Sequence, residues 1–140
     1  ALANAYAAAL FLTLMTREGQ RRAANPLACA LARYGDCHPR EQQTIAAITA
    51  WHTGDAPKAV GLLRATVQSW PHDVVAAKLC QILEIGLGDG RGMLQTSGMA
   101  AAVDGRSGYA LGLHAYALEQ AGECGLAMRF ARRAIEHNPG

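Results

Sequence analysis

Histidine and cysteine are the side chains in this sequence best suited to holding a metal ion. There are five histidines and four cysteines, and both residue types ligate zinc. No histidine is paired at i, i+4 with another ligand type on one helix, and no Cys-x-x-Cys spacing occurs. Cys80 and His114 are 34 residues apart, but equivalent helices of a stack are too far apart for both to reach one ion at about 2.0–2.3 Å. We therefore predict no metal and no cofactor, and assign Cys80 and His114 to packing.

Serine and glycine motifs can serve nucleophilic and phosphate chemistry. Ser69, Ser97 and Ser107 lack a Gly-x-Ser-x-Gly elbow and a recognisable triad spacing. The glycine-rich run 86–92 lacks the Lys-Ser/Thr of a phosphate loop and follows a helical pattern rather than a strand. We therefore predict no catalytic residue in this chain, and a hairpin turn in place of a phosphate loop.

The sequence that positions these side chains repeats with a period of 34 residues. Gly54, Gly88 and Gly122 are spaced by this period, and a column of small or proline residues follows at Pro71, Gly105 and Pro139. A 34-residue period is typical of tetratricopeptide helical hairpins, which stack into a solenoid with a long concave face. We expect the helices to touch at small residues, namely Ala59, Ala127, Ala131 and Ala134.

The period divides the chain into units of a single helical-repeat domain, residues 1–140. A degenerate N-terminal hairpin covers residues 1–39 and is out of register with the three repeat units 40–72, 73–106 and 107–140. The apolar spacing predicts helices over 2–17, 26–34, 41–52, 57–69, 74–86, 91–103, 107–120 and 126–137. Because the chain stops where another repeat would begin, we expect it to be truncated at its C-terminal end.

Composition agrees with an all-α, tetratricopeptide-like right-handed superhelix of antiparallel helix pairs. Hydrophobic residues make up 51% of the chain, carried mostly by Ala and Leu, and aromatic residues only 6%. The net charge of +2 is spread without a block of like charges, which predicts no nucleic-acid and no membrane partner. Residues 1–16 are too short for a spanning helix and have no basic flank before them. We expect a cytoplasmic protein with reduced, mostly buried cysteines.

Several segments resemble one known family. They are Trp70-Pro71-His72-Asp73 with Ala76-Ala77-Lys78, then Gly108-Tyr109, Ala115 to Glu119, and Ala134 to Pro139. The sequence is similar in these segments to the tetratricopeptide repeat protein 38 family and its bacterial relatives. The resemblance implies a helical-repeat fold and no defined reaction. It also implies that a histidine-rich helix carrying a glutamate follows the Asn-Pro.

The concave face of such a solenoid is the candidate binding surface. It is lined mainly by the first helix of each hairpin, and its aromatic and aliphatic side chains suit a helix or an extended apolar segment. The residues assigned to this face are Ile48, Trp51, His52, Lys78, Ile82, Tyr109, Tyr116 and Glu119. We expect a non-catalytic scaffold for a protein or peptide partner. Two alternatives stay open: the missing C-terminal part of the protein occupies the face, or the chain supports an enzyme or small-molecule-binding protein whose site lies beyond residue 140.

Overall fold

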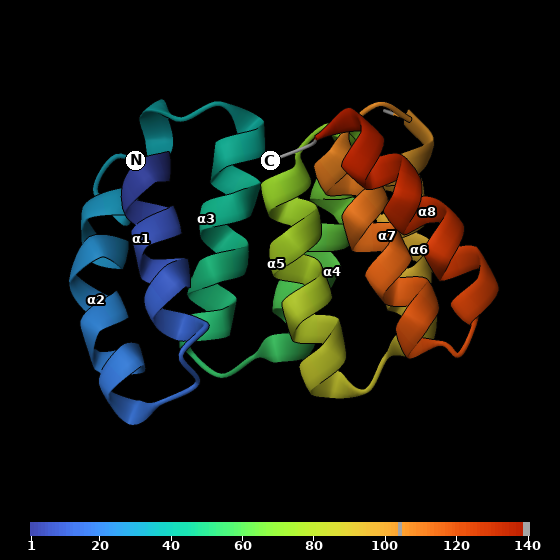
Figure 1. Cartoon of the computed structure of the whole chain (residues 1–140). Coiled ribbons are helices and arrows are strands. Elements are labelled where there is room, and N and C mark those ends of the chain that lie inside the picture. Colours follow the sequence, from blue (N-terminus) through green and yellow to red (C-terminus); the bar gives the residue numbers. More distant parts are fainter. Residues whose placement is uncertain (104, 139–140) are drawn as a thin grey trace. The chain divides into compact units, whose positions relative to one another are not determined.

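A computed structural model describes residues 1–103 and 105–138 of the chain. Within these residues the protein has eight α-helices, one short 3-10 helix and no β-strand (Figure 1). The helices are α1 Leu2–Leu12, α2 Arg17–Leu31, α3 Pro39–His52, α4 Ala56–Ser69, α5 Val74–Leu87, α6 Gly90–Val103, α7 Gly108–Gln120 and α8 Cys124–His137, and the 3-10 helix is Tyr34–Asp36. The all-α prediction is confirmed, while the superhelical arrangement stays a prediction.

The contacts between residues divide the chain into two compact units. The first unit is Ala1–Thr66 and the second is Val67–Gly140, so the boundary falls inside α4. In the first unit α1 packs on α2 and α3; in the second, α7 packs on α5, α6 and α8. The sequence-based prediction of a single domain stays a prediction.

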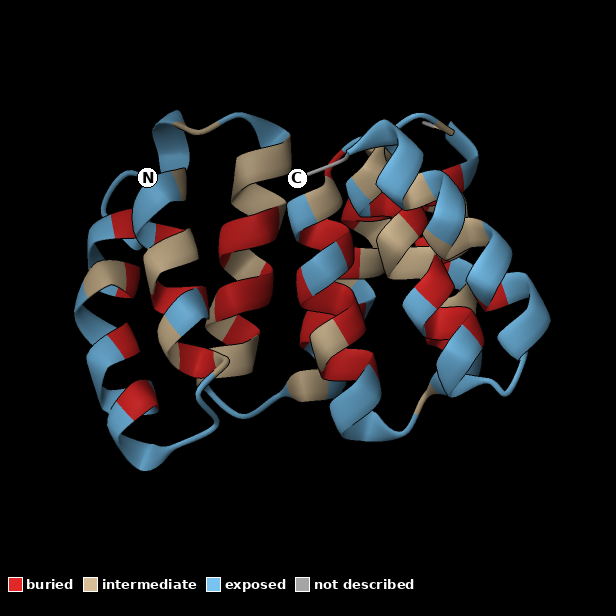
Figure 2. Ribbon diagram, in the orientation of Figure 1, coloured by how far each residue is buried: buried red, intermediate tan, exposed pale blue. Residues whose placement is uncertain are grey.

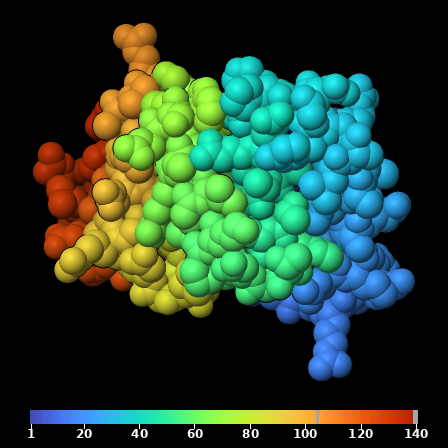
Figure 3. All heavy atoms as spheres, turned by 180° about the vertical axis from the view of Figure 1, so that it is seen from behind, coloured from blue at the N-terminus to red at the C-terminus, as the bar shows by residue number. Residues whose placement is uncertain are grey.

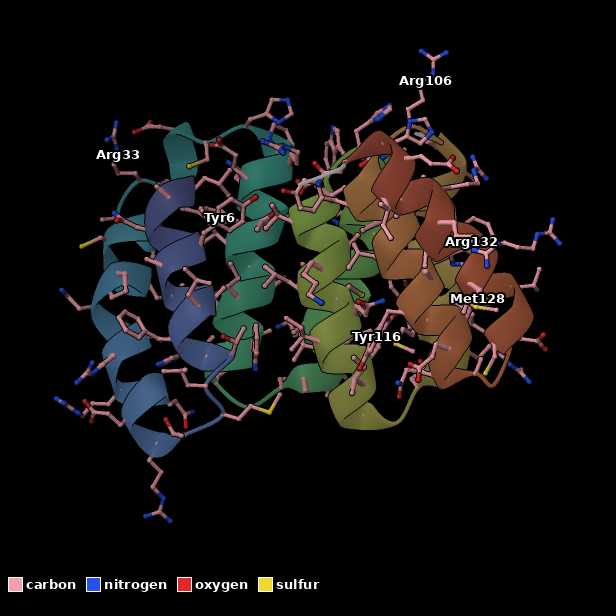
Figure 4. The ribbon with its side chains drawn as sticks, in the orientation of Figure 1. Tyr6, Arg33, Arg106, Tyr116, Met128 and Arg132 are labelled. Atoms are coloured by element: carbon pink, nitrogen blue, oxygen red, sulfur yellow. The ribbon has the colours of Figure 1, made fainter. Side chains whose placement is uncertain are left out.

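Small side chains allow close packing of α1 against α2 in the first unit. Ala5 and Ala8 of α1 and Ala23 of α2 are fully buried, and they form part of the buried faces drawn in red in Figure 2. A Cβ added to Gly19 would overlap the carbonyl oxygen of Phe11, so the first turn of α2 approaches the backbone of α1 without room for a side chain. Tyr6 projects from the side of α1 that faces α3 (Figure 4).

In the second unit α7 is the central helix. It packs on α5, α6 and α8, and the view from behind in Figure 3 shows the region of α6 in yellow to orange with α8 in red at the edge. The α5 and α7 helices run in the same direction, because one complete helix, α6, separates them along the chain. Side chains of α5 and α7 can therefore line a common groove, with the first turns of both helices at the same end.

The three periodic glycines form the same turn in each hairpin. Gly54, Gly88 and Gly122 have φ values of +87°, +70° and +82°, a left-handed conformation that glycine adopts at little cost. In each turn the N–H of the next residue donates to the carbonyl five residues earlier at 2.9 Å, which is the long bond of a Schellman motif. The three bonds run from Asp55 to Ala50, from Asp89 to Glu84 and from Glu123 to Leu118. The period read from the sequence thus corresponds to three equivalent helix ends.

Polar caps begin the helices on either side of these turns. The Asp55 and Asp89 side chains accept from Lys58 N at 3.1 Å and Gly92 N at 2.9 Å. Asp73 caps α5 through Ala76 N at 3.0 Å, and 34 residues later Ser107 caps α7 through Ala110 N at 3.2 Å. Such caps satisfy N–H groups that have no partner inside the helix.

Two sequence-based predictions are wrong in part, one about the turn of the first hairpin and one about the burial of four alanines. The first hairpin does not break before Pro26: the chain turns at residues 13–16, the Thr16 hydroxyl caps α2 at Gly19 N, and Pro26 lies inside α2. Ala59 and Ala127 are buried as expected, but Ala131 and Ala134 are only half-buried and line an open groove between α7 and α8. The predicted end of the last unit at Pro139 lies outside the described residues.

Candidate binding groove between α5 and α7

The second unit contains an open groove between α5 and α7 with a volume of about 700 Å³. Its walls are mostly apolar, and they carry two tyrosines, one amide side chain and one cationic side chain. The lining residues are Val74, Val75, Lys78 and Gln81 of α5, and Gly108, Tyr109, Gly112, Leu113 and Tyr116 of α7. We refer to these residues as the α5/α7 groove.

The groove is open because α7 has glycine at positions where the equivalent positions of α5 have larger side chains. The 34-residue period places Gly108 and Gly112 at the positions of Val74 and Lys78. A Cβ added at Gly112 would meet no atom within 4 Å, so the space beside this residue is empty. Gly108 differs, since its Cβ would lie 2.6 Å from Asn138 Cβ and 2.8 Å from Ala134 O. Gly108 therefore brings the start of α7 close to the end of α8, while Gly112 leaves room in the groove.

Two tyrosines and a lysine supply the exposed part of the lining. Tyr109 and Tyr116 retain 71% and 42% of their accessible surface, so both rings are available for contact with a ligand in the groove. The Lys78 Nζ lies 5.9 Å from the centroid of the Tyr116 ring, within the range of a cation–π contact. Figure 4 shows the Tyr116 side chain on the side of α7 that faces α5.

Buried polar contacts fix the helices that form the walls. Gln81 is 1% exposed and its Nε2 donates to the Leu113 carbonyl of α7 at 2.8 Å. About one turn further along α5, the Thr96 hydroxyl of α6 donates to the Glu84 carboxylate at 2.8 Å. Buried hydrogen bonds of this kind are costly to break because the separated groups lose their partners away from water. The spacing of α5 from α7 is thus set by specific contacts as well as by packing.

His114 joins α7 to both of its neighbours in chain order. Its Nδ1 lies 3.0 Å from the Ser97 hydroxyl of α6, and its ring meets Phe130 of α8 edge-on at a centroid distance of 4.8 Å. The Ser97 hydroxyl also donates to the Met93 carbonyl at 2.7 Å within α6. The Ser97–His114 pair thus ties α6 to α7. Burial lowers the pKa of His114.

The structure brings together three of the predicted binding residues. Lys78, Tyr109 and Tyr116 line one groove. Ile82 is half-buried and is not part of that lining. Glu119 is exposed and lines a second groove of about 550 Å³ between α7 and α8, which also contains Tyr116 and Ala131.

The predicted binding residues of the first unit have different environments. Ile48 is fully buried, so its assignment to a binding surface is wrong: its side chain is part of the core. Trp51 lines a cleft of about 420 Å³ that also contains Met15 and Gln20. His52 forms a reciprocal pair with Gln20, in which each side chain meets the other residue's backbone carbonyl, at 2.9 and 3.1 Å.

Sequence reasoning missed several groove residues, and one signal could have found some of them. Gly108 and Gly112 are one turn apart in a predicted helix, where glycine costs about 1 kcal/mol relative to alanine. Two such glycines on one face indicate a close approach or an open space. Gln81 and Leu113 gave no such signal, because their roles depend on the contact between α5 and α7.

No disulfide joins the cysteines among the described residues, and the prediction that most of them are buried is wrong. Cys80 is buried, Cys37 is half-buried, and Cys29 and Cys124 are exposed. In the described part of the chain, no three His, Cys, Asp or Glu side chains are grouped so that they could hold a metal ion. No helix among the described residues combines the length and the apolar character needed to cross a membrane.

Comparison of the sequence with protein-family models and with curated proteins finds no match. The assignment of a role to the groove therefore depends on its own geometry.

Proposed function

We propose that this chain is a non-catalytic, tetratricopeptide-like scaffold that binds an apolar segment of a protein partner in the α5/α7 groove. The observation that carries the proposal is the exposure of two tyrosines, 71% for Tyr109 and 42% for Tyr116, in the walls of a groove of about 700 Å³. Such a groove lets a partner bury rings that the isolated chain leaves in water. Tyrosine is enriched among the residues that contribute most to binding at protein interfaces.

The size and shape of the groove favour a polypeptide segment. Its volume is within the range of small-molecule sites, about 300–1,000 Å³, but it is open to solvent along two parallel helices and has few polar groups to fix a small ligand. An extended or helical segment can follow such a groove and place successive apolar residues in it. The equivalent turns at Gly88 and Gly122 support the repeat architecture in which first helices carry the partner.

A peptide selection tests the proposal. Peptides from a random displayed library are selected on the whole chain, and the affinity of the best one is measured by fluorescence polarisation. Substituting Tyr109→Ala or Tyr116→Ala should weaken binding by about tenfold or more, which corresponds to about 1.4 kcal/mol.

The matched control is Tyr34→Ala, which removes a 37% exposed tyrosine outside the groove. It should leave the affinity unchanged. Failure to select any peptide, or equal losses in all three variants, would contradict the proposal.

A further inference from the structure

We propose that the segment bound in the α5/α7 groove carries an acidic side chain next to its apolar residues, and that Lys78 pairs with this carboxylate. This inference rests on the proposed function and names the chemistry of the partner. It follows from the charges of the residues that line the groove, which include one cationic side chain and no acidic side chain.

Lys78 is the single charged side chain among the nine residues that line the groove. Lys78 is exposed, and within the described residues no carboxylate oxygen lies within salt-bridge distance of its Nζ. The nearest acidic residue in the sequence, Asp73, is 7% exposed, and its Oδ1 accepts from Ala76 N. A bound carboxylate would therefore meet a cation whose charge no described side chain already neutralises.

The position of the ammonium group favours a ligand that is apolar and anionic together. Nζ lies 5.9 Å from the Tyr116 ring centroid, so a carboxylate at Nζ would be adjacent to an aromatic wall. The apolar neighbour of the acidic residue could then occupy the space beside Gly112, where an added Cβ would meet no atom within 4 Å. A neutral apolar segment would fill the same space without using the cation.

The contribution of the charge pair should be modest and sensitive to salt. Exposed pairs of a lysine with a carboxylate change an equilibrium by about 1.4-fold to fivefold, and salt screens them. Pairing at the rim of an interface also affects the association rate and the orientation of the partner. The expected signature is thus a preference for an acidic ligand that disappears at high ionic strength.

The test uses two synthetic peptides and the ¹⁵N-labelled whole chain. The probes are N-acetyl-Leu-Phe-Glu-Leu-amide and its isosteric counterpart with Gln in place of Glu, and binding is followed through the amide signals of Gly108 and Gly112. The Glu peptide should bind about 1.4-fold to fivefold more tightly at low salt. Lys78→Gln should abolish this preference, whereas Lys58→Gln, at the chain's other lysine, should preserve it.

The outcomes separate this inference from the proposed function. Equal binding of both peptides, or a preference for Glu that survives Lys78→Gln, overturns the inference and leaves peptide binding intact. No perturbation of Gly108 or Gly112 by either peptide overturns both proposals. Dodecanoate is titrated as a third probe: binding of this lipid anion with no peptide binding would assign the groove to a fatty acid and also overturn both.

Discussion

Ser97 and His114 join α6 to α7 through a hydrogen bond of 3.0 Å between Oγ and Nδ1. The same imidazole packs edge-on against Phe130, and the Arg133 guanidinium lies 5.7 Å from the centroid of that ring. A row of side chains thus connects three consecutive helices of the second unit. Burial lowers the pKa of His114, which favours the neutral imidazole over the imidazolium in the folded chain.

The first prediction is that protonation of His114 destabilises the folded chain. Its folded-state pKa lies below the unfolded value of about 6.5, so the unfolded state binds more protons between these two values. The free energy of unfolding should therefore be highest above about pH 6.5, fall as the pH drops towards the folded-state pKa, and change no further below it. Thermal unfolding of wild type and His114→Asn between about pH 8 and pH 5 measures this. Asparagine retains an N–H near Ser97 but does not titrate, so an identical pH dependence in both proteins would refute the prediction.

Two glycines of α7 should respond in opposite directions to alanine. Gly112→Ala adds a methyl group to open space and should stabilise the helix by about 0.5–1 kcal/mol. Gly108→Ala places Cβ 2.6 Å from Asn138 Cβ and 2.8 Å from Ala134 O, and should cost about 1–3 kcal/mol through overpacking. Urea denaturation of both variants measures the change in the free energy of unfolding. Equal changes in the two variants would contradict the difference between Gly108 and Gly112.

Replacing Met15 with glycine should stabilise the folded chain. Met15 is the one non-glycine residue with positive φ in the described part of the chain, at +51°, a conformation that costs an L-residue about 1 kcal/mol. It is 70% exposed, so little packing is lost. Met15→Gly should raise the free energy of unfolding by about 0.5–1 kcal/mol, whereas Met128→Gly, at a 60% exposed methionine inside α8, should lower it by a similar amount. A loss of stability in both would contradict the account of the 13–16 turn.

These residues show how far the sequence alone could predict the fold. Gly54, Gly88 and Gly122 marked their turns correctly because glycine is favoured where φ is positive. The break between α1 and α2 was missed because Met15, and not glycine, takes that conformation. In the groove, Tyr109, Tyr116 and Lys78 were found from their type and register. The space beside Gly112 and the Gln81–Leu113 contact depend on how α5 meets α7, which no local pattern in the sequence specifies.

The cysteines should react with a thiol reagent in two phases. Cys29 and Cys124 are exposed and Cys37 is half-buried, whereas Cys80 is buried in α5. The native protein should therefore expose about three reactive thiols to a disulfide reagent such as DTNB, and a fourth only after unfolding, because access limits the rate of a thiol in a packed interior. Cys80→Ala should remove the slow phase alone. Four rapidly reacting groups in the native state would contradict the burial of Cys80.

The most direct test of the central claim is to locate a bound peptide on the chain. A selected peptide with a nitroxide label at one end is added to the ¹⁵N-labelled protein, and paramagnetic broadening of the amide and indole signals is measured. The account predicts strong broadening at Gly108, Gly112 and Tyr116, with little at Trp51 and Gln20 in the cleft of the first unit. Broadening centred on Trp51, with the Gly112 signal unaffected, would show that the binding surface lies elsewhere and contradict the claim.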